Sequence, residues 1–216
     1  GVRTQKRDFL EPFEEYHIRI VSNCPMEEDK RLALIVDALS LVEHGGVEWD
    51  HIGGGEKKNE LIQYAKEKLD GKVGIRYKFL GKLSHEETYA FYKDTYVDAL
   101  LSVSIAESVP TVMLEAMANR IFVVATEVDG VKDVVDNQSG MLLPSDITAV
   151  QLKNVLEGLC KISKEQIAEK SEQAYQCWRN HFDADQNGPL FASEISVARE
   201  ESAMDASDNN ANDLIR

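Results

Sequence analysis

Short apolar segments that alternate with amphipathic helical patterns constrain the fold of this chain more than any other feature. Strands are predicted at residues 17–22, 47–52, 75–81, 98–104, 121–126 and 141–143. Some of these segments have continuous apolar runs in place of alternation, which indicates that both faces of the sheet are buried. Because helical patterns separate the strands, their order predicts an α/β fold with a doubly wound, Rossmann-like parallel sheet.

The apolar residues between the strands recur at helical spacing. The segments in which this spacing predicts a helix are 31–42, 61–69, 86–93, 110–117 and, as a short helix, 131–135. Beyond Pro144 two further apolar stripes predict C-terminal helices, the first through Leu152 and Leu156 and the second through Ile167 and Trp178. The second half of the chain is therefore expected to end in helices that pack on the sheet.

Three regions follow from this pattern. Residues 1–14 are expected to be a linker or arm from a missing N-terminal domain, and the opening Gly1 in place of Met indicates processing or a fragment. Residues 15–195 form the Rossmann-like domain with its C-terminal helices. Residues 196–216, rich in Asp, Asn, Ser and Ala, lack the apolar content to fold and are expected to be a disordered tail.

Composition excludes several classes of function. The formal net charge of −14 leaves no basic surface for a phosphodiester backbone, so no nucleic-acid partner is expected. A nucleotide-sized ligand remains compatible with this charge, because it needs only one or two local cations. No apolar run approaches the roughly 20 residues that cross a bilayer. The 3 cysteines lie far apart without metal-binding spacing, which indicates free thiols in the cytoplasm and no bound metal.

A ligand site is expected where the strand 98–104 leads into the helix 110–117. In a doubly wound sheet, ligands bind beyond the carboxyl ends of the strands, where helix N-termini present free N–H groups. Ser108 is a candidate N-cap, and Pro110 suits the first turn, where its missing N–H matters least. The amides expected to face the crevice and form an anion site are those of Val109, Thr111 and Val112.

Two carboxylates, Glu107 and Glu115, flank an uncharged run in this segment. A carboxylate within an apolar segment is costly to desolvate unless hydrogen-bond donors surround it. Ligand hydroxyls are one such set of donors. The structural alternative is that Glu107 interacts with the helix dipole and Glu115 caps a buried amide. Spacing alone favours this alternative.

Other candidate site residues are ambiguous on their own. Gly53, Gly54 and Gly55 follow a strand without G-x-G-x-x-G spacing, so a tight strand-to-helix turn is the better interpretation. Lys30 begins the first helix and is either a solvated charge or the cation for a bound diphosphate. His85 follows the turn after the third strand and is more readily explained as a surface histidine than as a ligand contact.

The segment from Ser104 to Pro144 resembles the retaining glycosyltransferases of family 4, which have the GT-B fold. The matching stretches are E-S-V-P-T-V-M-L-E-A-M-A, V-V-A-T-E-V-D-G-V-K-D-V-V and G-M-L-L-P, supported by S-x7-K-R, H-I-G-G-G-E and F-L-G-K-L. The pair Glu107 and Glu115 is similar to the E-x7-E motif of that family. The resemblance extends from about residue 16 to about residue 192.

The resemblance implies a nucleoside-diphosphate-sugar donor and hexosyl transfer with retention at the anomeric carbon, without a metal or other cofactor. Glu107 is the implied catalytic residue, which holds the sugar and stabilises an oxocarbenium-like transition state. Glu115 is implied to bind the ribose hydroxyls, and Lys30 the diphosphate leaving group. The other implied donor-binding residues are Gly81, Lys82 and Leu83 at the nucleobase, and Ser108, Val109, Pro110, Thr111 and Val112 at the diphosphate.

A complete enzyme of this family has two Rossmann-like halves, and the resemblance covers only the second, donor-binding half. The missing N-terminal half is expected to bring the saccharide or lipid-linked acceptor. The expected process is polysaccharide or glycolipid assembly at the cytoplasmic side of a membrane, with possible peripheral association of the full-length protein.

The sequence departs from the family at two places. The acidic loop N-C-P-M-E-E-D before Lys30 lacks the usual Arg, and the segment 119–122 replaces the usual Gly and Pro. If the usual Gly has φ > 0, Arg120 is expected to be strained at that position by roughly 1 kcal/mol or more. An alternative is that Arg120 replaces the lost phosphate cation.

Three other functions compete with the glycosyltransferase. The two departures would fit a non-catalytic, degenerate nucleotide-sugar-binding module. A GT-B epimerase needs additional acid and base groups that the sequence does not reveal. A Rossmann dehydrogenase is the least supported, because no dinucleotide fingerprint is present.

Overall fold

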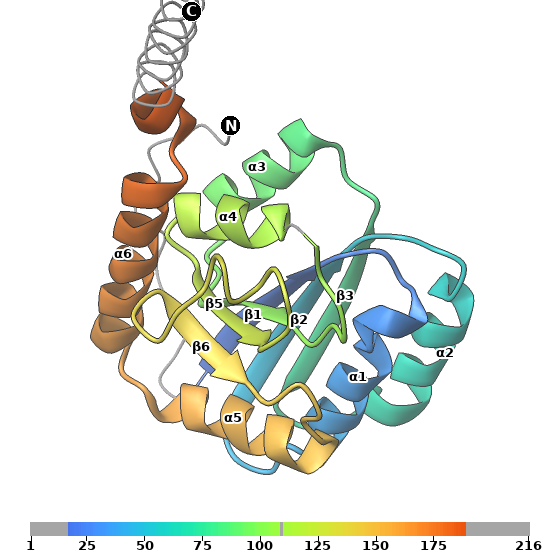
Figure 1. Cartoon of the computed structure of the whole chain (residues 1–216). Coiled ribbons are helices and arrows are strands. Elements are labelled where there is room, and N and C mark those ends of the chain that lie inside the picture. The colour runs from blue at the N-terminus through green and yellow to red at the C-terminus, as the bar shows by residue number, and fades with distance from the viewer. Residues whose placement is uncertain (1–16, 109, 189–216) are drawn as a thin grey trace, which may run out of the picture.

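The computed structural model describes residues 17–108 and 110–188 (Figure 1). These residues form a six-stranded sheet in the order β3-β2-β1-β4-β5-β6, and every neighbouring pair is parallel. The strands are β1 (His17–Asn23), β2 (Gly46–Ile52), β3 (Ile75–Gly81), β4 (Ala99–Ser102), β5 (Phe122–Thr126) and β6 (Gly140–Leu143). The strand order reverses between β1 and β4, which confirms the predicted doubly wound α/β fold.

Helices cover both faces of the sheet (Figure 1). One face packs against α1 (Leu32–Leu41), α2 (Lys58–Leu69) and α5 (Ala149–Lys161). The other face packs against α3 (His85–Asp94), α4 (Thr111–Ala118) and α6 (Lys164–His181). A short 3-10 helix, η1 (Glu28–Lys30), precedes α1. The two layers explain why β5 is buried at every position and apolar at all but Thr126, whereas the edge strand β3 exposes Arg76 and Lys78.

The predicted short helix at residues 131–135 is wrong. This segment forms a series of turns in which the Val131 amide donates to the Val128 carbonyl at 3.1 Å and the Val135 amide to the Val131 carbonyl at 2.8 Å. β-branched side chains disfavour helix, and here they are buried against the core, so tertiary packing decides the conformation. The predicted linker and disordered tail lie outside the described residues.

The turn between β2 and α2 packs directly against the turn between β1 and α1. The Cys24 amide donates to the Ile52 carbonyl at 3.1 Å, and the Met26 amide donates to the Gly54 carbonyl at 2.9 Å. Gly53 has φ +146°, and a Cβ atom at this position would lie 1.9 Å from the Cys24 carbonyl oxygen. The glycines therefore form the tight strand-to-helix turn expected from the sequence, with no room for a side chain at Gly53.

Glu157 joins α5 to the loop that follows α1. Its buried carboxylate accepts hydrogen bonds from the Glu43 amide at 2.8 Å and the His44 amide at 3.1 Å, and it pairs with Lys153 at 3.0 Å. The Glu43 hydrogen bond, aided by Lys153 and the His44 amide against the opposing effect of burial, lowers the pKa of Glu157 to about 2. This carboxylate therefore stabilises the fold only in its charged form.

We predict that Gly53→Ala destabilises the domain by more than about 3 kcal/mol, because it combines a steric collision with an unfavourable φ. Gly71→Ala is the matched control, since Gly71 has φ +78° but open space around its Cα. That variant is expected to cost only about 1 kcal/mol. Urea unfolding followed by circular dichroism measures both, and equal losses would contradict the steric account.

Glu157 should also make stability depend on pH. Its pKa is depressed from the usual value of 4.5, so its stabilisation is present above that pH and is lost as the pH falls towards 2. Between about pH 5 and pH 3, the wild type should therefore lose more free energy of unfolding than Glu157→Gln does. The exposed Glu86→Gln variant, measured by the same urea titrations, should follow the wild type.

Candidate functional site

A cavity of 680 Å³ opens beyond the carboxyl ends of the strands, near the point where the strand order reverses. Loops that follow β1, β2 and β3 line it together with the start of α4. The predicted donor-binding residues that line it are Lys30, Lys82, Leu83, Glu107, Pro110, Thr111 and Val112. A second cavity of 450 Å³ between α1 and α2 is more apolar and contains none of these residues, so the convergent polar groups identify the first cavity as the site.

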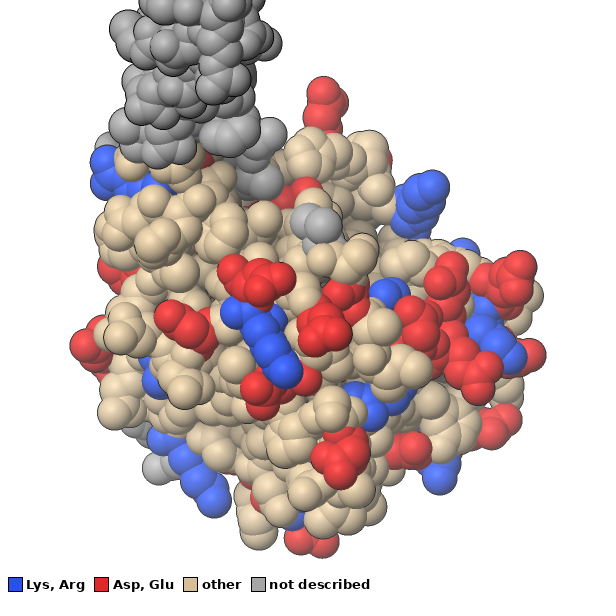
Figure 2. Space-filling model, in the orientation of Figure 1, with Lys and Arg blue, Asp and Glu red and all other residues tan. Residues whose placement is uncertain are grey.

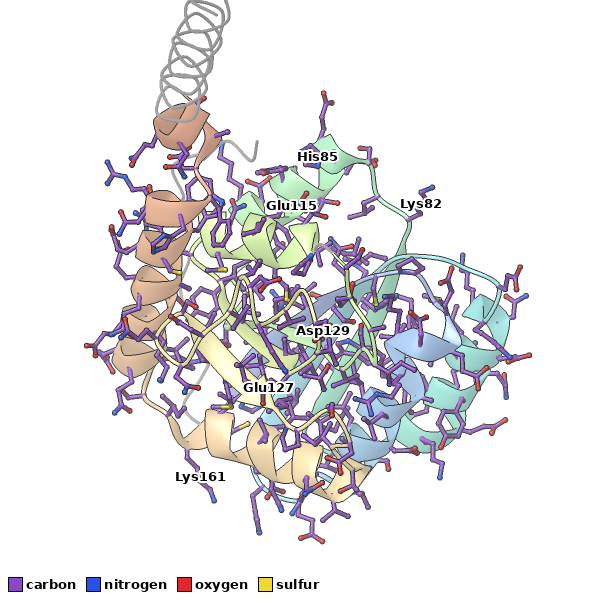
Figure 3. The ribbon with its side chains drawn as sticks, in the orientation of Figure 1. Lys82, His85, Glu115, Glu127, Asp129 and Lys161 are labelled. Atoms are coloured by element: carbon purple, nitrogen blue, oxygen red, sulfur yellow. The ribbon has the colours of Figure 1, made fainter. Side chains whose placement is uncertain are left out.

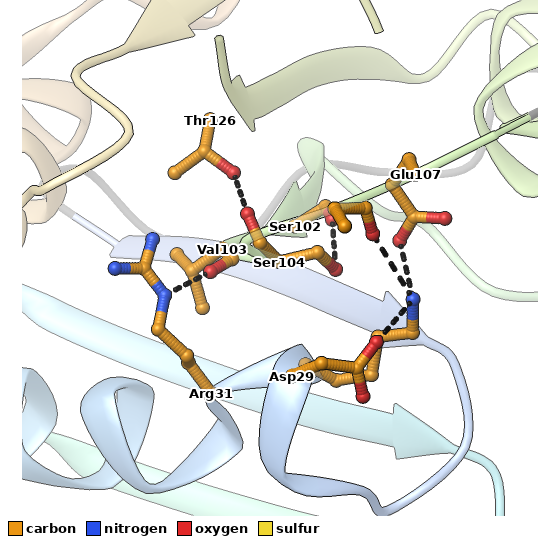
Figure 4. Close-up of polar contacts among 9 residues, drawn as sticks. Asp29, Arg31, Ser102, Val103, Ser104, Glu107 and Thr126 are labelled. Atoms are coloured by element: carbon orange, nitrogen blue, oxygen red, sulfur yellow. Dashed lines mark hydrogen bonds and ion pairs between the residues drawn. The ribbon is translucent and has the colours of Figure 1, made fainter. Parts of the chain in front are cut away.

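The centre of this site is an ion pair between Lys30 and Glu107 (Figure 4). The Lys30 Nζ atom lies 3.1 Å from Glu107 Oε1, 3.1 Å from Asp29 Oδ2 and 3.4 Å from the Ala106 carbonyl oxygen. Burial by itself lowers the pKa of Lys30, but the hydrogen bonds with Glu107 and Asp29 outweigh it and raise the pKa. Lys30 is therefore a stable cation whose charge two carboxylates already balance.

Backbone and hydroxyl contacts fix the segment that carries Glu107. The Ile105 amide donates to the Asp29 carbonyl at 2.9 Å. The Thr126 hydroxyl donates to the Ser104 carbonyl (Figure 4). The loop after β4 is thus attached to the loop after β1 on one side and to the end of β5 on the other. Glu107 and Lys30 meet because their backbones are held together, independently of their own attraction.

The start of α4 differs from the prediction. The helix begins at Thr111 with Pro110 as its N-cap, and no side chain caps it. Ser108 is three residues before the helix, too far for the cap geometry expected of it, in which the hydroxyl accepts from an amide of the first turn. The Pro110 carbonyl accepts from the Met113 amide at 2.9 Å, and Thr111 and Val112 line the cavity as predicted. Val109 lies outside the described residues.

Two of the remaining predicted residues lie beside the cavity and not in its lining. Gly81 ends β3, and its carbonyl accepts from the Gly53 amide at 2.8 Å. Ser108 lines an adjoining cavity that shares Lys30 and Glu107 with the first. The predicted diphosphate residues that the structure describes thus line two cavities that share the Lys30–Glu107 pair.

Glu115 is buried within α4 and faces α3 (Figure 3). Its Oε1 atom lies 3.3 Å from His85 Nδ1, and the His85 ring packs against Tyr89. Burial raises the pKa of Glu115, and the charge of His85 opposes that rise. Among the described residues its carboxylate accepts no backbone amide hydrogen bond, so the capping role considered from the sequence is not observed. Sequence reasoning had not paired His85 with Glu115, because the contact joins two different helices.

Two arginines occupy backbone conformations that favour glycine. Arg31 has φ 47° and Arg120 has φ 54°, which confirms the positive φ expected at Arg120. The idea that Arg120 replaces a phosphate cation is wrong, because its Nε atom lies 2.7 Å from Glu172 Oε2 and its guanidinium stacks 3.7 Å from the Tyr175 ring centre. Both partners lie on α6, and these contacts offset the backbone strain.

The residues that the structure describes contain neither a metal-binding cluster nor a membrane-spanning helix. Across residues 17–108 and 110–188, no three histidine, cysteine or acidic side chains converge as a metal-binding group. Over the same residues, every helix is too short or too polar to cross a lipid bilayer.

The sheet order and the ion-paired crevice define a doubly wound α/β domain with a candidate ligand site at the strand reversal. The chain belongs to the glycosyltransferase family described as Glycosyl transferases group 1, whose sequence model matches residues 16–160. Its fold matches that of GT-B glycosyltransferase domains. Comparison with curated protein sequences gave no match.

Solved structures of this fold are similar at low sequence identity. A variant of S. aureus TarM in complex with fondaparinux, α-GlcNAc-glycerol and UDP gives a TM-score of 0.68 at 17% identity, over 88% of this chain and 38% of that one. Anabaena HepE in complex with UDP and glucose gives 0.67 at 20%, over 84% and 49%. The C-terminal domain of Francisella tularensis LpcC gives 0.63 at 19%, over 76% and 86%. The chain thus spans less than half of TarM and HepE.

We predict that His85→Ala raises the pKa of Glu115 further, because it removes the charge of His85, which opposes the effect of burial. The pKa of Glu115 is measured as the midpoint of an NMR titration that follows its carboxyl carbon. His44→Ala is the control, since His44 is an exposed histidine on the distant loop before β2. A Glu115 midpoint that moves equally in both variants, or downwards in His85→Ala, would contradict the assigned pairing.

Proposed function

We propose that this chain is the donor-binding domain of a retaining, family 4 glycosyltransferase that takes a hexosyl group from a nucleoside-diphosphate sugar. The observation that carries the proposal is the Lys30–Glu107 pair, held at 3.1 Å at the strand reversal and beside the start of α4. The acceptor is a saccharide or lipid-linked molecule, bound with the help of an N-terminal half. The UDP present in the HepE and TarM structures supports a nucleotide ligand of this kind.

The diphosphate is proposed to lie between α4 and Lys30. The first amides of a helix lack intrahelical acceptors and carry the positive end of the dipole, so the amides of Thr111 and Val112 suit an anion. Lys30 supplies the full positive charge. We expect no metal ion in this step, since amides and a lysine already oppose the charge of the leaving group.

The nucleoside is proposed to occupy the side of the cavity near Lys82 and Leu83, with Glu115 accepting hydrogen bonds from the ribose hydroxyls. A buried carboxylate without amide donors is stabilised by ligand hydroxyls, because they replace the hydrogen bonds of water. His85 orients this carboxylate from α3, at 3.3 Å.

Glu107 is proposed to act on the sugar. When the diphosphate engages Lys30, one of the two carboxylates on that lysine loses its partner. Glu107 then accepts hydroxyl groups of the sugar, and its charge stabilises the positive character that develops at the anomeric carbon. Transfer with retention follows the family resemblance. The full-length enzyme is proposed to work at the cytoplasmic face of a membrane with peripheral association.

One observation favours a second candidate, a non-catalytic module that binds nucleotide-sugars weakly. Arg120 is engaged with Glu172 and Tyr175, so it does not replace the arginine absent from the acidic loop. The cations among the described residues that line the cavity are Lys30 and Lys82, and Lys30 already contacts two carboxylates. Weak donor affinity is the expected consequence.

The two candidates are separated by Glu107→Gln. This change removes one carboxylate from Lys30 but keeps the side-chain shape, so UDP should bind about as tightly as to the wild type, or more tightly. In a protein that includes the N-terminal half, transfer should fall by about 100-fold, the size expected for loss of a charge-stabilising group. Unchanged transfer would favour a structural role for Glu107, and no transfer by the wild type would favour the binding module.

Lys30→Ala tests the diphosphate site directly. We predict that it weakens UDP binding by about tenfold or more, because a charge-assisted phosphate contact is lost. Lys57→Ala is the matched control, since Lys57 lines the cavity between α1 and α2 and pairs with Glu60. Calorimetric titration with UDP, GDP and ADP sugars measures the effect. A folded wild type that binds none of these nucleotides would contradict the proposed function.

A further inference from the structure

A third cavity, of 440 Å³, continues from the first across the Lys30–Glu107 pair. Both residues line both cavities. The remaining lining comes from the loop after β4 and from the turn after β5, and its members are Ile105, Ala106, Ser108 and Asp129. Asp129 has no role in the proposed function.

The order of groups in the ligand indicates what this third cavity holds. A nucleoside-diphosphate sugar carries its nucleoside and its sugar on opposite sides of the diphosphate. Lys82, Leu83 and the start of α4 lie on the first cavity, and Lys30 lies between the two. With the diphosphate at Lys30 and the nucleoside near Lys82, the sugar extends into the third cavity. This step rests on the proposed function.

The backbone next to Asp129 lies against the loop that carries Glu107. The next residue, Gly130, has φ +78°, and a Cβ atom there would lie 2.5 Å from the Glu107 carbonyl oxygen and 2.6 Å from that of Ser108. The turn after β5 is therefore in direct contact with the loop that carries Glu107. Asp129 lies near the centre of the face shown in Figure 3, with Glu127 close by.

The charge of this cavity is negative. Lys30 is the only cation among its described lining residues, and Glu107 and Asp29 already contact that lysine at 3.1 Å each. Lys132, on the same turn as Asp129, pairs with Glu127 at 3.9 Å. Acidic side chains are spread over this face, with basic ones between them (Figure 2). Asp129 thus adds a negative charge that the lining does not balance.

We propose that Asp129 is a specificity-determining residue, which restricts the donor to nucleotides of neutral hexoses and excludes those of uronic acids. Ionised carboxylates only accept hydrogen bonds, so Asp129 and Glu107 suit sugar hydroxyls, which donate. A carboxylate on the sugar would face two like charges without a free cation. Like charges across a binding site discriminate between ligands that otherwise have the same shape.

The test compares two donors that differ only at the sixth carbon of the sugar, UDP-glucose and UDP-glucuronate. Their dissociation constants are measured on the full chain by calorimetry at low salt. The wild type should bind UDP-glucuronate at least about tenfold more weakly, a ratio equivalent to about 1.4 kcal/mol. Asp129→Asn should reduce this ratio by about tenfold, and Asp129→Lys should reverse the preference. GDP-mannose and GDP-mannuronate replace the pair if GDP binds better than UDP.

Asp133→Asn is the matched control, because Asp133 is an exposed acid on the same turn that does not line the cavity. It should leave the ratio at its wild-type value, and high salt should reduce the ratio in the wild type. An unchanged ratio in Asp129→Asn, or an equal change in Asp133→Asn, would overturn the inference. A wild type that binds UDP without distinguishing the two sugars would also overturn it, whereas failure to bind any nucleoside diphosphate would contradict the proposed function itself.

Discussion

The parallel pairing of β1 with β4 is the constraint on which the site depends. These strands are far apart in the sequence, and their register joins Ile20 to Ala99 and Val21 to Leu100. Because parallel strands end at the same edge of a sheet, this short register brings the loop after β1 beside the loop after β4. The Asp29 carbonyl then meets the Ile105 amide, and Lys30 meets Glu107. A register shift of one residue would separate all four groups.

Local pattern was sufficient to predict most of the fold. Burial on both faces makes β5 apolar from Phe122 to Ala125, and this pattern is visible in the sequence alone. Residues 131–135 were mispredicted because their valines satisfy a helical pattern as well as a packed turn, and the core decides between them. Lys30 and Glu107 could be placed at one crevice because each follows a strand, but the roles given to them came from the family resemblance. The pairings of His85 with Glu115 and of Arg120 with Glu172 were not predictable, since they depend on how separate helices pack.

The two arginines with positive φ show why backbone and side chain must be considered separately. A positive φ costs a residue with a Cβ about 1–2 kcal/mol. Arg120 offsets this with an ion pair and a stacked ring on α6, and Arg31 donates a hydrogen bond to the Val103 carbonyl. The φ of Arg120 could be anticipated from the family resemblance. The direction of its guanidinium could not, because the packing of α6 on α4 determines it.

The net charge of −14 repels an anionic ligand unless a cation lies at the binding site. Lys30 is such a cation in the crevice. Glu107 and Asp29 stabilise the lysine, so the crevice contains a cation that costs little to maintain. Under the proposed function, a diphosphate would compete for that cation and displace a carboxylate from it. Under the proposed function, Glu107 therefore becomes available to the sugar only once the diphosphate is in place. The Lys30–Glu107 pair would weaken donor binding, because the diphosphate has to displace Glu107 from Lys30. The same displacement would make Glu107 available to the sugar, so it would couple donor binding to the transfer step.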